Sequence, residues 1–119
     1  MPEKPEQIRG RLKITVTAGG RGPVVFLSGE ADLEAAAELT AVLLAQTESG
    51  ADHVTVNLSG LTFADSASLR AFIVAHHALQ GRGGSLELDR PPPHVARVLS
   101  LLGIDQVLSV HGTKLEPGA

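Results

Sequence analysis

The periodicity of apolar residues changes several times along the chain, and the first periodicity is that of β-strands. Residues 12–16 alternate apolar and polar side chains, as a half-buried strand does, and residues 24–27 form a second apolar run after a glycine-rich turn. We expect these two strands to form a hairpin. Short apolar runs at residues 54–58 and 85–88 predict a third and a fourth strand.

Residues that favour turns follow two of these strands. Residues 28–32 contain Gly29 and Asp32, and we expect them to break the second strand. Residues 59–65 begin with a Ser-Gly pair and end with Asp65, and we expect a short connection there instead of more strand.

Three segments space their apolar residues at helical intervals. Residues 33–47 are strong helix formers, and Asp32 directly before them is a good N-cap. One face of this helix is expected to carry Leu33, Ala36, Leu39 and Leu43. The second helix follows Ser66 and carries Leu69, Phe72, Ile73, His76 and Leu79. A proline triplet at residues 91–93 opens the third, whose apolar stripe is Val95, Val98, Leu99 and Leu102.

The order of elements, β-β-α-β-α-β-α, predicts an α/β fold in a single domain. Strands that alternate with helices favour parallel pairing through right-handed crossovers, so we expect a four- to five-stranded mixed sheet with helices mainly on one face. The length of 119 residues fits one domain. We assign residues 11–112 to this domain, and residues 1–10 and 113–119 to flexible tails. The last apolar residues are expected to close the core as a short element or strand: Ile104, Val107, Leu108 and Val110.

Composition and charge exclude several classes of function. The formal net charge of −3 argues against direct nucleic-acid binding, which needs a basic surface. The chain has no cysteine, which excludes disulfides, thiolate catalysis and zinc–cysteine sites. Its first residues are polar, unlike a signal peptide, and its apolar runs are too short for membrane insertion. We therefore expect a cytoplasmic protein.

Asp65 and Ser66 lie between the third strand and the second helix, where both can have a chemical role. Backbone N–H groups at a helix start lack intrahelical partners, and either side chain can cap them. A phosphate on Ser66 would add about −1.5 to −2 charges at the positive end of the helix dipole, which tolerates an anion. From spacing alone the pair is either a plain helix cap or a phosphorylation switch.

The remaining polar clusters do not predict a metal, a cofactor or an enzyme. His76 and His77 are adjacent on a helix, so their side chains diverge by about 100° and do not share one metal ion. His76 lies on the apolar face, which favours a packed histidine at the edge of the core. The glycines of residues 81–84 follow a helix and precede a strand, the wrong order for a phosphate-binding loop. We find no nucleophile–base pair or cofactor loop in the sequence.

Three stretches together resemble the STAS family, named for sulphate transporters and anti-sigma factor antagonists. Residues 27–32 read Leu-Ser-Gly-Glu-Ala-Asp, similar to the family's Gly-Glu-apolar-Asp pattern at a strand end. Residues 56–66 resemble its strand, loop and phosphorylation motif, and residues 93–104 resemble its last helix. The resemblance covers nearly all of residues 12–110.

The resemblance implies an anti-sigma factor antagonist that works by binding and not by catalysis. In such proteins the Ser after an Asp is phosphorylated by a partner that is both an anti-sigma factor and a serine kinase. The unphosphorylated antagonist binds this partner and releases a sigma factor. Carried over by position, Ser66 is the phosphoacceptor and Asp65 its neighbouring acid. The implied partner-binding residues are Gly29, Glu30, Asp32, Asp65, Ser66 and Ser68.

The sequence departs from the family motif directly after Ser66. The family continues with a second Ser or Thr and then Gly, whereas this chain has Ala67 and Ser68. Three outcomes follow: Ser66 is still modified, Ser68 is modified instead, or the protein binds without regard to phosphorylation. The alternative function is therefore a phosphorylation-insensitive STAS-like binding module or scaffold in a transport or signalling complex.

Overall fold

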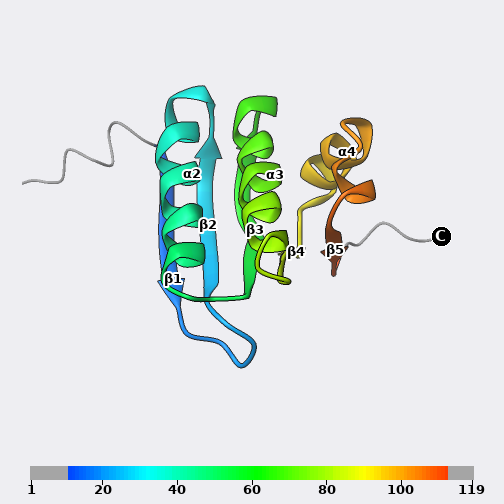
Figure 1. The fold of residues 1–119 in the computed structure, drawn as a ribbon. Coiled ribbons are helices and arrows are strands. Elements are labelled where there is room, and N and C mark those ends of the chain that lie inside the picture. Colours follow the sequence, from blue (N-terminus) through cyan, green and yellow to red (C-terminus); the bar gives the residue numbers. More distant parts are fainter. Residues whose placement is uncertain (1–10, 113–119) are drawn as a thin grey trace, which may run out of the picture.

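The computed structural model describes residues 11–112, an α/β domain built around one sheet (Figure 1). The predicted tails at residues 1–10 and 113–119 lie outside the described residues. In chain order the elements are β1 (Leu12–Thr17), β2 (Val24–Ala31), α2 (Leu33–Glu48), β3 (His53–Ala64), α3 (Ser66–Gln80), β4 (Ser85–Asp89), α4 (Pro93–Leu101), the short 3-10 helix η1 (Ile104–Gln106) and β5 (Ser109–His111).

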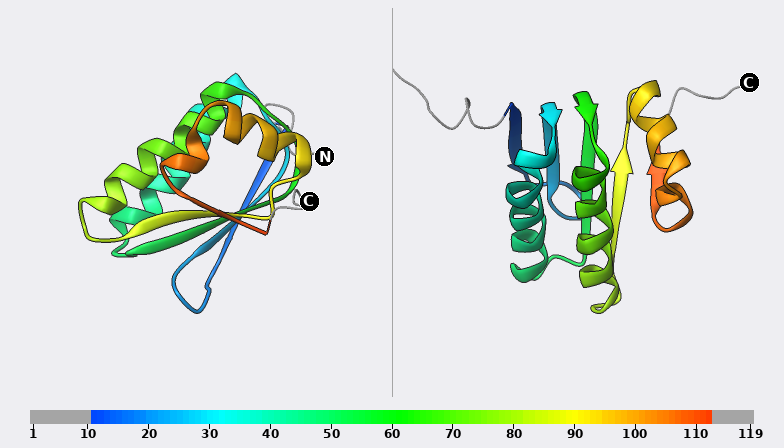
Figure 2. Two further views of the ribbon diagram at one scale, coloured as in Figure 1. Left: turned by 90° about the vertical axis from the view of Figure 1, so that its right-hand side faces the viewer. Right: turned by 90° about the horizontal axis from the view of Figure 1, so that it is seen from above.

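The sheet has five strands in the order β1-β2-β3-β4-β5. The β1–β2 hairpin is antiparallel, and β2, β3, β4 and β5 pair in parallel. Helices α2, α3 and α4 lie on one face of the sheet, as the views in Figure 2 show. The predicted fold class, a mixed sheet with its helices on one face and the element order β-β-α-β-α-β-α, is confirmed.

The core lies between the sheet and the helices and is almost entirely aliphatic. Alternation along each strand turns every second residue toward the helices, which buries an apolar set from β2, β3 and β4. These residues are Val25, Leu27, Val54, Val56, Leu58, Leu86 and Leu88. The largest fully buried side chain, Phe72, comes from α3. His76 is also buried, as predicted, and its Nδ1 accepts a hydrogen bond from the backbone N–H of Leu86 at 3.2 Å.

Two strands extend further than the sequence predicts. Residues 28–31 continue β2, and residues 59–64 continue β3, so the expected strand breaks are wrong. The register between β2 and β3 shifts twice. Phe26 pairs with Asn57 but Ser28 with Gly60, and Gly29 pairs with Leu61 but Glu30 with Phe63. β-Bulges absorb extra residues without ending a ladder, and they accommodate the glycines that a sequence pattern treats as strand breakers.

Two predicted core leucines are exposed. Leu33, the first residue of α2, is 71% exposed, and Leu102, directly after the last residue of α4, is 48% exposed. In α2 the predicted Leu39 and Leu43 are buried, and the buried face is completed by Ala35 and Thr47, whereas Ala36 is only half-buried. After α4, Ile104 and Leu108 are buried and close the core, whereas Val107 is exposed.

Candidate functional site

Helices α2 and α3 begin next to each other, just beyond the carboxyl ends of β2 and β3. Their preceding strands, β2 and β3, run parallel, and Ala31 pairs with Ala64 at the last position of both. The backbone N–H of Asp65 donates to the carbonyl oxygen of Ala31 at 3.0 Å, so the two turns are joined. Parallel pairing therefore places Asp32 and Asp65 side by side, although 33 positions separate them in the sequence.

Asp32 and Asp65 cap the helices that follow them. The Asp32 carboxylate accepts a hydrogen bond from the backbone N–H of Ala35 at 3.1 Å, and the Asp65 carboxylate accepts one from the N–H of Ser68 at 3.0 Å. Both residues have the extended backbone of an N-cap. The capping role expected from the sequence is thus present at both positions.

Ser68 holds the two turns together from the inside. Its side chain is 0% exposed, and its hydroxyl donates to the backbone carbonyl oxygen of Asp32 at 2.9 Å. A kinase has no access to this hydroxyl while the domain is folded as described. The residue that replaces the family's glycine is therefore part of the packing between α2 and α3.

Ser66 is the first residue of α3, and its side chain is exposed. It lines a hollow of about 300 Å³ together with Arg70, Ile73, Leu102 and Ile104. The hollow lies where the first turns of α3 meet the segment that follows α4. Ser66 thus combines a helix start, which tolerates an added anion, with access from solvent.

Gly29 and Glu30 lie at the end of β2, and each is engaged with the chain beside it. Gly29 has a φ of +99°, and a Cβ there would collide with the carbonyl oxygen of Arg11. The Arg11 Nη1 atom lies 2.6 Å from the Glu30 Oε1 atom, and this hydrogen-bonded ion pair raises the pKa of Arg11. Gly29 is therefore needed for a close backbone approach. Glu30 presents a carboxylate, paired with Arg11, near the same end of β2.

Two apolar residues near these caps were not singled out as site residues by the sequence analysis. Leu33 follows Asp32, and Phe63, which is 46% exposed, comes two residues before Asp65. Exposed aromatic and aliphatic side chains beside polar ones are typical of surfaces that bind other proteins. The sequence does contain a signal for them, since each lies within two residues of a capping Asp. The sequence analysis instead assigned Leu33 to the core face of a helix and Phe63 to the connection at residues 59–65.

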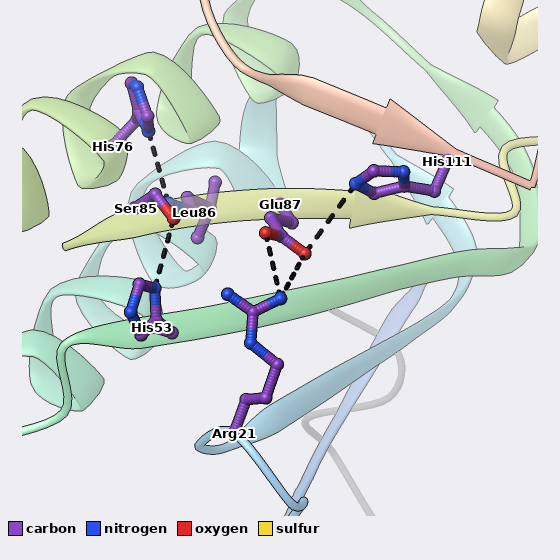
Figure 3. A network of polar contacts seen from close by, with 7 residues as sticks. All are labelled: Arg21, His53, His76, Ser85, Leu86, Glu87 and His111. Atoms are coloured by element: carbon purple, nitrogen blue, oxygen red, sulfur yellow. Dashed lines mark hydrogen bonds and ion pairs between the residues drawn. The ribbon is translucent and has the colours of Figure 1, made fainter.

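A separate polar network lies away from the predicted site residues (Figure 3). Arg21, in the β1–β2 turn, pairs with Glu87 on β4, with their side-chain atoms 3.2 Å apart, and His111 lies 3.7 Å from the same carboxylate. On the neighbouring strand, His53 Nδ1 is 3.2 Å from the Ser85 hydroxyl. These contacts link the β1–β2 turn to β4, and β4 to β3 and β5, and they include none of the six predicted partner-binding residues.

The described residues, 11–112, show neither a metal-binding group nor a membrane-spanning helix. No group of three or more His, Cys, Asp or Glu side chains there has an arrangement that would hold a metal ion. Over the same residues, no helix has both the length and the apolar character needed to cross a bilayer.

Comparison with known proteins places this geometry in a family. The family model described as "Mlab, STAS domain" matches residues 14–110. The chain belongs to the STAS family. The capped turns after β2 and β3 of this STAS domain therefore correspond to the strand ends that carry the family resemblance in the sequence.

Individual relatives carry names that bear on its role. An anti-sigma-B factor antagonist from Staphylococcus epidermidis is 28% identical over 93 residues, which is 77% of this chain and 86% of the relative. Among solved structures, an anti-sigma factor antagonist from Mycobacterium paratuberculosis has a TM-score of 0.78 at 22% identity, covering 87% of each chain. The phosphorylated form of the Bacillus cell fate determinant SpoIIAA has a TM-score of 0.66 at 22% identity, covering 82% of this chain and 90% of that one.

Proposed function

We propose that this STAS domain is an anti-sigma factor antagonist. In this proposal it binds an anti-sigma factor that is also a serine kinase, releases the sigma factor held by that partner, and is switched off when Ser66 is phosphorylated. The observation that carries the proposal is the position of Ser66, exposed at the first residue of α3 and beside the capped start of α2. The protein acts in the cytoplasm by binding, and the phosphoryl transfer is the work of the kinase.

The start of α3 can accept a phosphate without loss of the fold. The Ser66 side chain is outside the core, and the cap of α3 is made by Asp65, so a phosphate displaces no packed group. The unpaired N–H groups of the first helical turn and the positive end of the helix dipole both favour an added anion. What changes is the surface, which gains bulk and about −1.5 to −2 charges.

Ser66 is better placed than Ser68 to be the phosphoacceptor. The Ser68 hydroxyl is buried and already donates to the Asp32 carbonyl oxygen, so a phosphate there would break the junction between α2 and α3. The departure of Ala67 and Ser68 from the family motif therefore changes the inner packing of the turn. It leaves the hydroxyl of Ser66 on the surface.

The surface proposed to bind the partner is made by the ends of β2 and β3 and the starts of α2 and α3. It includes all six predicted positions: Gly29, Glu30, Asp32, Asp65, Ser66 and Ser68, the last as a buried support. To these we add the exposed side chains of Leu33 and Phe63, which supply apolar area for docking. Support for an anti-sigma factor as the partner comes from the names of the relatives. A SpoIIAA structure in the phosphorylated form supports the switch.

The test is a reaction of the purified protein with its candidate anti-sigma factor kinase and ATP. We expect a stable complex before ATP is added, and then phosphate on Ser66 by mass spectrometry, with none on Ser66→Ala. Failure to form a complex together with failure to phosphorylate would remove the proposal.

A second candidate is a binding module that is insensitive to phosphorylation and serves a transport or signalling complex. The replacement of the motif glycine by a buried Ser68 favours it, because that substitution alters the backbone region that a kinase approaches. The same experiment separates the two candidates. A stable complex with no phosphate on Ser66, and equal binding by Ser66→Asp, would identify the second.

A further inference from the structure

Arg70 lies one helical turn after Ser66 on the same side of α3. Both side chains are exposed, and both line the hollow of about 300 Å³ whose other walls are Ile73, Leu102 and Ile104. Among residues 11–112, no carboxylate comes within ion-pair distance of the Arg70 guanidinium. The hollow is thus lined by one serine hydroxyl, one cation and three aliphatic side chains.

The direction of helical side chains brings these two groups together. In a helix the Cα–Cβ bonds tilt toward the N-terminus, and residues four apart lie one above the other. This direction puts Ser66 within the reach of an Arg70 side chain that extends toward the helix N-terminus. An acidic group placed four residues before a basic one is also the favourable order for a helical ion pair.

A phosphate on Ser66 would be the acidic group that this arrangement lacks. Arginine binds phosphate through two parallel N–H···O hydrogen bonds, which a lysine does not reproduce. Asp65, the nearest carboxylate in sequence, is occupied by the Ser68 N–H and is on the capping side of the turn.

We propose that Arg70 binds the phosphate of phosphorylated Ser66, and that this ion pair covers the mouth of the hollow between α3 and η1. The inference rests on the proposed function, because that function supplies the phosphate. It adds a second effect to the switch. The unmodified protein presents an open hollow and a cation that no carboxylate of residues 11–112 pairs with, whereas the modified protein presents an ion pair in the same place.

The experiment uses the full chain with phosphoserine incorporated at position 66 during translation, so that no kinase is needed. The phosphate is titrated by ³¹P NMR. The second pKa of a phosphoserine is about 6, and a bound guanidinium lowers it by favouring the dianion. We expect this pKa to be lower by about 0.3 or more in the wild-type background than in Arg70→Gln. In Arg70→Lys we expect an intermediate value.

Arg82→Gln is the matched control. It removes the same charge two residues beyond the last residue of α3, and the helix, about 20 Å long, separates it from Ser66. It should leave the titration unchanged. Equal pKa values in the wild-type and Arg70→Gln backgrounds would overturn the pairing. This result is distinct from failure of the proposed function, which would appear as an unmodified protein that binds no anti-sigma factor, whatever the phosphate titration shows.

Discussion

The hydroxyl of Ser68 donates a hydrogen bond to the backbone carbonyl oxygen of Asp32 across 2.9 Å, joining two helix starts that are 36 positions apart in the chain. With the bond from the Asp65 N–H to the Ala31 carbonyl oxygen, it fixes the two turns that form the proposed binding surface. Ser66 is held by this junction yet points outside it. Hydrogen bonds therefore join the two turns of this surface, and the Ser66 side chain remains accessible from solvent.

Replacing Ser68 with alanine should destabilise the domain. The substitution removes the hydroxyl donor, and the part-buried Asp32 carbonyl oxygen keeps only the hydrogen bond from the Ala35 N–H, which costs about 0.5–1.5 kcal/mol. We expect a loss of that size in the free energy of unfolding, measured by urea denaturation. Ser100→Ala, at an exposed position of α4, is the control and should change stability by less than about 0.5 kcal/mol. A similar small change for Ser68→Ala would mean that the bond contributes little.

Introducing a negative charge at Ser66 should leave the fold intact. An acidic residue in the first turn of a helix stabilises it by about 0.3–1 kcal/mol. Ser66→Asp should therefore unfold at the same urea concentration as the wild type or a slightly higher one. Ser66→Asn, similar in size but neutral, shows what the shape change alone does. Marked destabilisation by Asp would mean that the hydroxyl is part of the packing.

The stability of the domain should depend on the protonation of His76. Burial lowers the pKa of His76, with repulsion from His77 as a smaller cause, and its Nδ1 accepts the Leu86 N–H only while unprotonated. The unfolded chain then binds a proton more readily than the folded one. The stabilisation is complete above about pH 6.5 and is lost as the pH falls from there through the lower folded-state pKa.

The measurement is the free energy of unfolding between pH 5 and pH 8, compared between the wild type and His76→Gln. Glutamine keeps an acceptor but does not titrate, so the difference between the two proteins should shrink as the pH falls. His77→Gln, at the exposed neighbouring position, removes only the smaller cause of the lowered His76 pKa, so its curve should keep most of the wild-type pH dependence. A difference that stays constant across this range would contradict the assignment.

Two leucines near the end of α4 should behave differently. Leu99 is 1% exposed, and its replacement by alanine should cost about 2–5 kcal/mol of stability. Leu102, 48% exposed, should lose less than about 1 kcal/mol on the same change, because little of its surface is removed from water by folding. Denaturant unfolding of both variants checks this contrast, and equal losses would show that α4 packs in another orientation.

The sequence predicted the fold well because aliphatic periodicity specifies it. The alternation of Val54, Val56 and Leu58 and the helical spacing of Leu69, Phe72 and Leu79 were both found as expected. The ends of the strands were missed, because the bulges that let β2 and β3 continue past Ser28 and Gly60 depend on pairing between the strands. Local turn propensity contains no information about that pairing.

The sequence predicted which positions belong to the candidate site. It did not predict which atoms of these residues contact each other, and the structure was needed for that. Asp32 and Asp65 were recognised as capping residues from their places before helices. The burial of Ser68 was not foreseen, since its hydroxyl bonds to a carbonyl oxygen in a distant turn. The exposure of Leu33 was missed because helical spacing identifies a face but not which residues of the first turn the rest of the fold covers.

The central claim is that phosphate on Ser66 blocks an interaction with an anti-sigma factor. The most direct measurement is the dissociation constant of the anti-sigma factor by titration calorimetry, for the unmodified protein and for the protein carrying phosphoserine at position 66. We expect the modified protein to bind at least about tenfold more weakly, since an added charge at a packed interface costs more than 1.4 kcal/mol. Equal dissociation constants for the two forms would contradict the account.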